Sequence, residues 1–499
     1  MTEERGAPAP GSGTERPEQR ERPEQRERPG RPRRPLLTMR AVAWLDDRLG
    51  AASFARRTLN KVFPDHWSFM LGEVALYCFV VLVLTGTFLA FFYVPDVEEV
   101  VYRGPYEPIR GQTVSRAYES VLRLSFEVRA GLVFRQIHHW AAVVMVAAVA
   151  AHAARVFFTG AFRRPRDLNW MLGVLLLVLT LAVGFSGYSL PDDQLSGTGL
   201  RIMFSVAQSV PVVGPWIAFL LFGGEYPAPD ILNRLFFLHV MVLPATIAAV
   251  VAAHVALVWH QKHTQFPGPG RSEANVVGER LWPRYAFKSV GLFFVIAGVL
   301  AGMGGLAQIN PVWLYGPYRV AAVSAASQPD WYFGWLEGAL RLFPNWEVRA
   351  LGYEVPNVFF PGVLLPGLVF LSMFLWPAIE RRLTGDREVH HLLDRPRDAP
   401  WRTALGSGVV AFMVVLTLAG GNDVLAAALG VSVETVTLTL RALAVAAPPL
   451  VFALTAWVAR ELKARAAHPV REVRAPVIVR TPSGGFEARE EEPGQRRLS

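Results

Sequence analysis

Four histidines lie within long apolar stretches of the sequence and recur at nearly the same interval. They form two pairs, His138 with His152 and His239 with His254, and the second pair is spaced one residue wider than the first. At about 1.5 Å and 100° per residue, a helix would separate each pair by roughly 21 to 22 Å and turn both imidazoles toward similar directions. Ionisable side chains at membrane depth are costly and are usually functional. Each stretch therefore predicts a membrane helix with one imidazole near each surface.

If the two helices run parallel, His138 lies level with His239, and His152 lies level with His254. Two level imidazoles from facing helices are the axial ligands that a haem iron needs. The single cysteine, Cys78, excludes a covalent Cys-x-x-Cys-His attachment and an iron–sulfur cluster. The pattern predicts two non-covalent haems, an outer one on the first pair and an inner one on the second. Four unrelated core histidines are the alternative, which suits a lone histidine better than a matched set.

Four glycines repeat the step from His138 to His152 on two other apolar stretches. Gly72 and Gly86 are separated by this step, and so are Gly173 and Gly187. Missing side chains at two depths would let a flat macrocycle approach each backbone. The competing interpretation is close helix packing, for which glycine is common in membranes.

Three further basic side chains flank the predicted ligands. Arg135 and Arg155 stand at the two ends of the first histidine helix. They could anchor the helix at the membrane interfaces or bind haem propionates. His139 points to another face of the helix than His138, so we expect it to bind no iron.

The elements that must position these residues are charge-free stretches long enough to cross about 30 Å of hydrocarbon. The 499-residue chain is 52% apolar and only 18% charged, whereas soluble domains carry about a quarter charged residues. The stretches are 74–95, 136–154, 168–191, 202–224, 235–261, 289–318, 355–379, 403–422 and 442–459. The fourth contains Pro211, Gly214 and Pro215, and we expect it to form short helices at the outer surface.

The loop charges favour eight spanning helices. With 202–224 outside the membrane, one side receives the loops 155–167, 262–288 and 380–402, and the other receives 96–135, 192–234, 319–354 and 423–441. The first set is less than half as long in total, yet it carries more Lys and Arg. The positive-inside rule then puts the basic loops and both termini in the cytoplasm, in a multi-pass cell-membrane protein.

The tails differ in composition from the centre. The N-terminal tail repeats Glu-Arg-Pro-Glu-Gln-Arg at 15–20 and 21–26, a pattern typical of disorder rather than of a secretory signal. The expected organisation is a tail at 1–40, a dihaem domain at 41–265, a second helical domain at 266–463 and a tail at 464–499. The basic surplus of +9 flanks apolar stretches instead of covering a soluble face, which argues against nucleic-acid binding.

Several motifs carry a resemblance to a known family. They are Arg135-Gln-Ile-His138, His152-Ala-Ala-Arg155, Leu238-His239, Gly187-Tyr-Ser-Leu-Pro191 and Pro329-Asp-Trp-Tyr332. Over roughly residues 60–460 the chain resembles the cytochrome b subunit of respiratory cytochrome bc complexes. The stretches 158–166 and 261–270 resemble its actinobacterial branch in particular. The resemblance implies an all-α membrane protein of eight helices, with a haem-binding four-helix bundle followed by four further helices.

The resemblance also implies an activity and partners. The family is a quinol–cytochrome c reductase that oxidises quinol, here menaquinol, near the outer surface. One electron passes to a Rieske iron–sulfur subunit, and the other crosses two b haems to a quinone at the inner side, which contributes to the proton-motive force. A cytochrome c subunit, expected to be dihaem, a dimeric complex and a supercomplex with a terminal cytochrome oxidase are the implied partners.

The Pro329-Asp-Trp-Tyr332 motif is similar to the family's quinol-site motif, in which glutamate usually stands at the position of Asp330. We expect Asp330 to accept a proton and Tyr332 to orient a quinol oxygen. The alternatives are a helix cap for Asp330 and aromatic packing for Tyr332. The pocket is expected between the 202–224 segment and this motif.

The inner quinone site is less well defined. Lys288-Ser289 stands where many family members have Lys-Asp, so the usual acid is missing. The basic residues at the inner ends of the helices could replace it, or could serve only as interfacial anchors. These candidates are His260, Lys262, His263 and Lys288.

Two rival classes remain open at this point. A transporter or channel would use the histidines as a proton relay but leaves the matched depths and glycine steps unexplained. A dihaem anchor for a dehydrogenase or hydrogenase shares the haems but has no use for the Pro-Asp-Trp-Tyr motif.

Overall fold

The computed structural model describes residues 38, 43, 44, 46–48, 50–322, 328–350, 352–467, 477–480 and 486–489. The chain separates into two compact units, 1–58 and 59–499. Helix α2 (Ala51–Leu59) closes the first unit. The tail predicted at 1–40 lies outside the described residues apart from residue 38.

Eight helices of the second unit are long and apolar enough to cross a membrane, counted over the described residues. They are Trp67–Ala90 (η1, Trp67–Met70, and α3, Leu71–Ala90), Gly131–Phe158 (α5), Asp167–Tyr188 (α6), Ile231–Gln261 (α9, Ile231–Phe237; η3, Leu238–Val242; α10, Leu243–Gln261), Leu281–Leu306 (η4, Leu281–Tyr285, and α11, Ala286–Leu306), Phe360–Thr384 (η6, Phe360–Leu364, and α14, Leu365–Thr384), Pro400–Gly420 (α15) and Val433–Ala466 in α17 (Val433–Ala467). The eight spans expected from the charge-free stretches, and the all-α class, are confirmed.

The predicted spans that differ most from the structure at their ends are 289–318 and 442–459. The helix expected over 289–318 ends at Leu306, where Ala307 takes an extended conformation. Asn310, with a positive φ of 43°, and Pro311 then keep the helix from resuming at once. The last helix is longer than 442–459 and begins at Val433.

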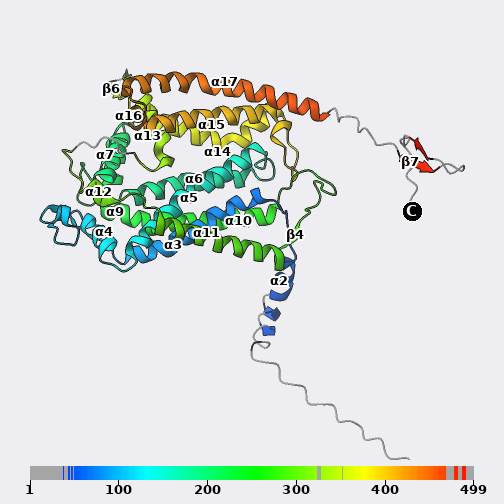
Figure 1. Cartoon of the computed structure of the whole chain (residues 1–499), viewed down its shortest axis with the longest axis horizontal. Helices are drawn as coiled ribbons and strands as arrows, with labels where there is room; N and C mark the ends of the chain where they lie inside the picture. Colours follow the sequence, from blue (N-terminus) through cyan, green and yellow to red (C-terminus); the bar gives the residue numbers. More distant parts are fainter. Residues whose placement is uncertain are drawn as a thin grey trace, which may run out of the picture. The chain divides into compact units, whose positions relative to one another are not determined.

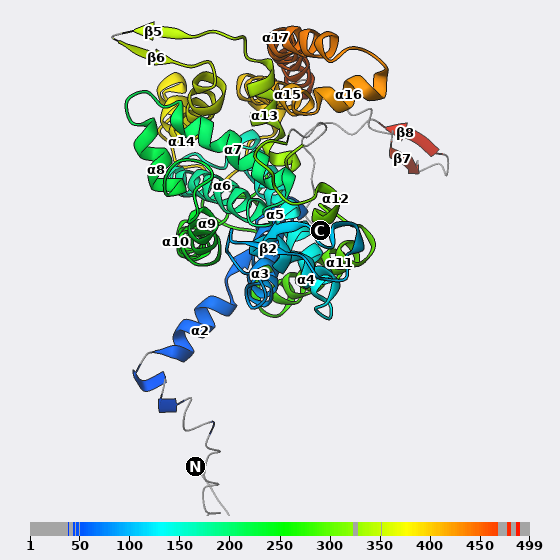
Figure 2. The same cartoon turned by 90° about the vertical axis from the view of Figure 1, so that its left-hand side faces the viewer.

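The long helices of the second unit lie side by side with their connections gathered at two ends (Figure 1). In sequence order, α3 packs on α5, α6 packs on α10, and α11 covers both α3 and α5. The remaining helices form a second group, in which α14 contacts α6 and α15 contacts α17 (Figure 2). The first group carries every residue that the sequence analysis links to a haem.

One end, which we call the outer end, carries most of the shorter elements. They are β2 (Glu99–Val101), β3 (Thr113–Ser115), α4 (Arg116–Phe126), α7 (Gln194–Gln208), α8 (Gly214–Phe222), α12 (Val312–Tyr315), η5 (Trp331–Phe333), α13 (Gly334–Leu342), β5 (Val348–Ala350), β6 (Tyr353–Val355) and α16 (Asn422–Leu429). Strands β2 and β3, and β5 and β6, form antiparallel pairs. In the C-terminal stretch, β7 (Val477–Arg480) pairs with β8 (Phe486–Arg489).

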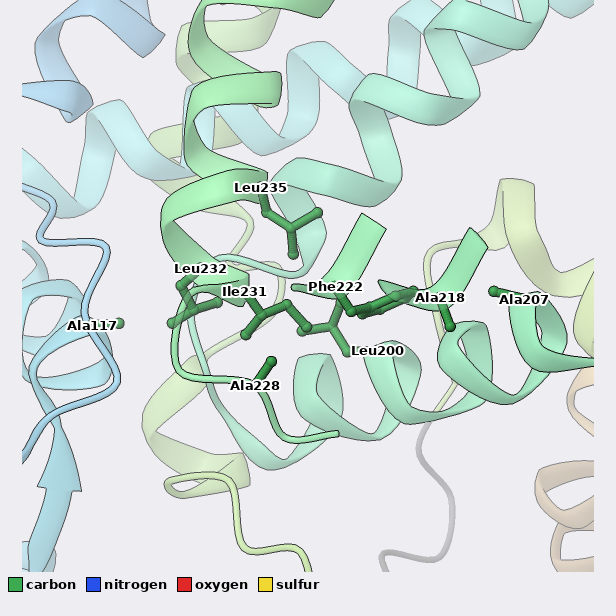
Figure 3. Packing of buried hydrophobic residues seen from close by; sticks show 9 residues of the cluster. All are labelled: Ala117, Leu200, Ala207, Ala218, Phe222, Ala228, Ile231, Leu232 and Leu235. Atoms are coloured by element: carbon green, nitrogen blue, oxygen red, sulfur yellow. The ribbon is translucent and has the colours of Figure 1, made fainter. Parts of the chain in front are cut away.

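The 202–224 stretch forms two short helices, as expected. Asp193 caps α7, accepting a 2.7 Å hydrogen bond from the backbone N–H of Ser196. The chain turns at 209–213 and starts α8 at Gly214. Apolar side chains of α7 and α8 pack against α9 rather than facing a lipid core on all sides (Figure 3).

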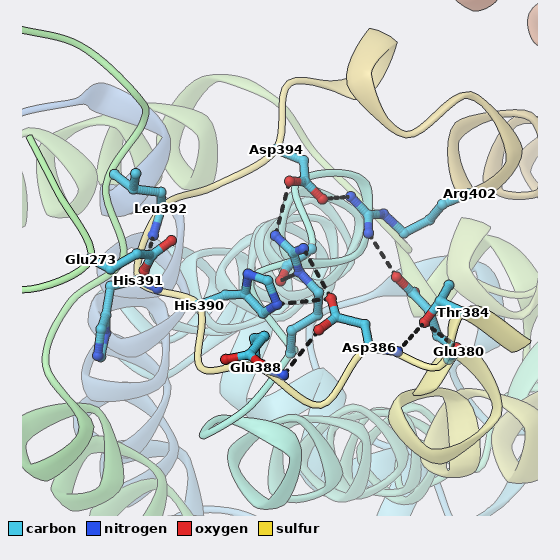
Figure 4. Close-up of polar contacts among 12 residues, drawn as sticks. Glu273, Glu380, Thr384, Asp386, Glu388, His390, His391, Leu392, Asp394 and Arg402 are labelled. Atoms are coloured by element: carbon cyan, nitrogen blue, oxygen red, sulfur yellow. Dashed lines mark hydrogen bonds and ion pairs between the residues drawn. The ribbon is translucent and has the colours of Figure 1, made fainter. Parts of the chain in front are cut away.

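The opposite end, which we call the inner end, holds the loops 159–166, 262–280 and 385–399, and β1 (Val62–Phe63) pairs there with β4 (Glu279–Arg280). A buried ion-pair network fixes the last loop: Arg402 contacts Glu380 at 2.8 Å and Asp394 at 2.6 Å (Figure 4). Arg166 donates to the carbonyl oxygens of His390 and Lys262, so one guanidinium ties two loops together. Burial lowers the pKa of Arg166 to about 10, which leaves it charged.

Candidate functional site

The outer histidine pair faces across the bundle from α5 and η3. The ring centroids of His138 and His239 lie 6.2 Å apart. The hydroxyl of Thr85 donates to the carbonyl of Val81, so its oxygen can accept from Nδ1 of His138 at 2.9 Å. Nδ1 of His239 lies 3.0 Å from the carbonyl oxygen of Val183. These bonds favour the Nδ1–H tautomer and leave each Nε2 free to bind a metal.

The inner pair repeats this arrangement near the other end of α5. The ring centroids of His152 and His254 lie 6.5 Å apart, with ring planes at 73° against 71° in the outer pair. Neither Nδ1 atom has a side-chain hydrogen-bond partner among the described residues, and the backbone of Asn169 lies beside the ring of His254. The two levels predicted from the sequence are therefore present as two facing pairs.

A local change of helix type explains why the second histidine spacing is wider by one residue. The segment Leu238–Val242, which includes His239, is π-helical, and the N–H of Leu243 bonds to the carbonyl of Leu238. A π-helical turn holds one extra residue without displacing the helix that follows. The spacing is thus equivalent to the step from His138 to His152.

Each of the four predicted glycines faces one of the four imidazoles. A Cβ atom on Gly86 would lie 3.0 Å from Cε1 of His138, and one on Gly72 would lie 3.3 Å from Cε1 of His152. A Cβ atom on Gly187 would overlap the ring of His239. The fourth contact is looser, because a Cβ atom on Gly173 would lie 3.6 Å from Cε1 of His254. The glycine step therefore makes room for the imidazole rings themselves.

Two buried guanidinium groups fit the anionic edges of a haem. Arg135 donates one nitrogen to the carbonyl of Asn310 at 2.6 Å, but its Nη1 is buried without a partner among the described residues. Nε and Nη2 of Arg155 are unpartnered in the same sense. Buried donors rarely stay unpaired, and propionate carboxylates are suitable acceptors. The residues present thus fit two bis-histidine haems.

A cavity of about 280 Å³ opens beside the outer pair. Its walls include His138, His239 and Gly187 and also Asp330 and Tyr332 of the Pro-Asp-Trp-Tyr motif. The structure therefore brings the predicted outer ligands and the predicted quinol residues to one space.

We expected the 202–224 segment to form one wall of the quinol pocket, and for this cavity that expectation is wrong. No residue of that segment lines it; Asp193, Leu195 and Ser196 at the start of α7 do so instead. The reason is that the segment buries its apolar side chains against α9. Burial raises the pKa of Asp193 to about 6, and this carboxyl lines the cavity together with Asp330.

Asp330 uses its carboxylate for contacts with side chains rather than for a helix cap. It precedes η5 but makes no side-chain cap hydrogen bond. One oxygen lies 2.9 Å from Nε2 of His139, and the other accepts a 2.9 Å hydrogen bond from the hydroxyl of Tyr332. Tyr332 is buried, and Gly184 on α6 leaves room for its hydroxyl. The geometry therefore argues against the alternative in which Asp330 serves as a helix cap.

Sequence reasoning missed the part played by His139. We expected no iron on it, and it faces Asp330 rather than the other imidazoles of the pairs. The two residues are 191 positions apart, so no local pattern connects them. The single available signal was a second histidine beside a predicted ligand.

The four inner quinone candidates have different surroundings. Lys288 is ion-paired with Asp65 at 3.1 Å and Glu279 at 2.9 Å. His260 is exposed, and Lys262 takes a positive φ at the end of α10. His263 is mostly enclosed and its Nε2 is buried without a partner among the described residues, while burial lowers its pKa to about 4.

The chain is similar to proteins of known family. A 444-residue alignment with the cytochrome bc1 complex cytochrome b subunit of Mycobacterium bovis shows 49% identity and covers 89% of this chain and 81% of the relative. The corresponding Streptomyces coelicolor protein is 46% identical over 90% of this chain and 82% of its own length. This chain belongs to the cytochrome b family of bc1 complexes.

Two further comparisons agree with this family. The family model described as cytochrome b (N-terminal)/b6/petB matches residues 143–317. A solved chain of a hyperthermophilic respiratory Complex III has the same fold, with a TM-score of 0.62 over 84% of this chain and all of that one at 19% identity. This cytochrome b is thus a multi-pass membrane protein that holds haem b and works within a multisubunit complex. The transporter and dehydrogenase-anchor interpretations are wrong.

Proposed function

We propose that this cytochrome b holds two haems and oxidises quinol beside the outer one. The observation that carries the proposal is the shared cavity, in which Asp330 and Tyr332 lie with His138 and His239. We assign the outer iron to His138 and His239, the inner iron to His152 and His254, and the propionates to Arg135 and Arg155. When bound, the haems supply one-electron carriers at two depths of the membrane.

The side chains of the cavity then handle the proton of the quinol. Asp330 accepts a proton from the quinol hydroxyl, because its carboxylate is held in the cavity wall by His139 and Tyr332. Tyr332 keeps the carboxylate oriented by donating to it, and its buried ring shapes the wall. A fixed carboxylate close to the electron acceptor favours proton removal in the geometry of the reaction.

The electron and proton routes extend beyond this cavity. The quinol is menaquinol. One of its electrons goes to a Rieske iron–sulfur subunit and then to a dihaem cytochrome c subunit, and the other goes to the outer haem. Inner-side reduction of a quinone near His260, Lys262, His263 and Lys288 completes the cycle. The complex is a dimer in a supercomplex with a terminal oxidase. The chain itself lies in the cell membrane with both termini in the cytoplasm, and it is divided into the two tails and the domains 41–265 and 266–463.

The experiment is quinol-driven haem reduction in the intact complex. Asp330→Asn keeps the hydrogen-bonding shape but removes the proton acceptor, so we expect at least tenfold slower reduction with both haems retained. Asp330→Glu is the matched control and should retain most of the rate. An unchanged rate and pH–rate profile in Asp330→Asn would remove Asp330 from the proton path.

A further inference from the structure

A carboxylate at the inner end is surrounded by hydroxyl groups. Glu73 lies in the first turn of α3. One of its oxygens accepts a hydrogen bond from Ser289 at 2.6 Å, and the other accepts from Tyr285. The Tyr77 hydroxyl lies 2.5 Å from the Ser289 hydroxyl and 3.4 Å from Glu73. Three hydroxyls from two helices therefore converge on one acid.

No ion pair with a cation of the described residues neutralises Glu73. Lys288 is a candidate cation because it precedes Ser289 in the chain, but it forms ion pairs with Asp65 and Glu279. An unpaired carboxylate in a membrane helix is costly and is functional by default. Hydroxyls can donate to the ionised acid and accept from the protonated one, so this cluster accommodates Glu73 in both states.

The position of Glu73 links the inner histidine pair to the inner surface. Its neighbour Gly72 faces the ring of His152. On the other side, Tyr285 stacks on Phe63 with ring centroids 4.5 Å apart, and Phe63 lies 4.3 Å from the ring of His263. The acid, the hydroxyls and the unpartnered Nε2 of His263 thus belong to one continuous set of contacts.

We propose that Glu73 is the proton donor to the quinone reduced at the inner side. The inference rests on the proposed function, which supplies the quinone and its electrons. It also explains the missing acid of Lys288-Ser289, because the carboxylate absent from α11 is provided by α3 and hydrogen-bonded to that same serine.

The proton transfer is matched to the electrons that the quinone receives. The quinone takes two electrons, one at a time, from the haem bound by the inner pair. Glu73 gives its proton to one carbonyl oxygen, so the acid O–H bond breaks as the quinol O–H bond forms. The second proton and the proton that restores Glu73 come from the inner aqueous phase.

The test uses the intact complex in membranes with outer-site oxidation running. Glu73→Gln retains size and hydrogen bonding but carries no transferable proton. We expect reoxidation of the inner haem to slow at least tenfold, while its absorbance and the first reduction of the outer haem are unchanged. Redox-induced infrared difference spectra should lose a carboxylic C=O band in this variant.

A second variant and a control keep the result specific. Glu73→Gln combined with Ser289→Asp returns the acid to α11 and should recover most of the rate. Asp167→Asn removes another first-turn acid at the inner end of a membrane helix, paired with Arg381 at 3.6 Å, and should change nothing. Wild-type reoxidation in Glu73→Gln, or loss of its inner haem, would overturn the proposal. Absence of quinol-driven haem reduction in the unmodified complex would instead contradict the proposed function.

Discussion

The outer and inner histidine pairs share one geometry but differ in their surroundings. Their ring separations are 6.2 and 6.5 Å. The outer imidazoles are held at Nδ1 by Thr85, Ser186 and a backbone carbonyl. The inner imidazoles have no hydroxyl partner among the described residues, and leucines stand where the outer site has these hydroxyls, directly before Gly72 and Gly173.

This difference shows how two histidine pairs of the same geometry could give two haems different redox potentials. A hydrogen bond at Nδ1 makes the imidazole a stronger donor to the iron, which stabilises the oxidised state. The outer iron should therefore have the lower potential, and electrons should pass from the outer to the inner site. If two haems bind as proposed, the histidine pairs fix their positions, and the hydroxyls beside the outer pair separate their potentials.

The largest expected effect comes from removing one ligand at each level. His239→Ala should abolish the outer haem and quinol oxidation, while His254→Ala should remove the inner haem. Pyridine haemochrome analysis should give one haem per chain in each variant instead of two, and redox-resolved spectra should identify the survivor. Loss of the same haem in both variants would break the assignment of levels.

Substitutions of the glycines compare the two levels more precisely, because they leave all four histidines in place. Gly187→Ala places a methyl group on the ring of His239, whereas Gly173→Ala makes only an ordinary contact with His254. We expect outer haem occupancy to fall at least fivefold in the first variant and inner occupancy to remain near normal in the second. Haem-to-protein ratios of the purified complexes measure both. Equal losses would mean that the glycines serve general helix packing.

The smallest effect is on the potential of the outer haem. Thr85→Val removes a hydroxyl acceptor from His138, and a lost hydrogen bond of about 0.5–1.5 kcal/mol corresponds to a rise of roughly 20–60 mV for one electron. Redox titration of both haems measures this shift, and the inner potential should stay constant. Thr87→Val is the matched control, because Thr87 is exposed and its hydroxyl bonds to the carbonyl of Val83 in its own helix. A shift in the control would assign the effect to the helix rather than to His138.

Features set by helical periodicity and charge were predictable from the sequence. The eight spans follow from apolar length, and the two histidine levels follow from the regular spacing within each pair, because in a helix such a spacing fixes height and direction together. The glycine step was visible for the same reason. The role of each glycine was less visible, since only the packed helices show that Gly86 and Gly187 make room for imidazole rings.

Features that depend on contacts between distant segments could not be predicted. The pairing of His139 with Asp330 joins α5 to the loop before η5, and the support of Ser289 by Glu73 joins α11 to α3. Neither pair has a fixed spacing, so no periodic pattern reveals it. The 202–224 segment was misplaced as a cavity wall because amphipathic surface helices can bury their apolar side in several directions.

The π-helical turn at Leu238–Val242 has a consequence for how this protein tolerates change. A one-residue insertion in a rigid helix would rotate everything beyond it by about 100° and separate the histidines of one face. Here the added residue is absorbed within a single turn, next to the ligand itself. The π-helical turn therefore keeps His239 and His254 facing His138 and His152, although their spacing along the chain is one residue wider.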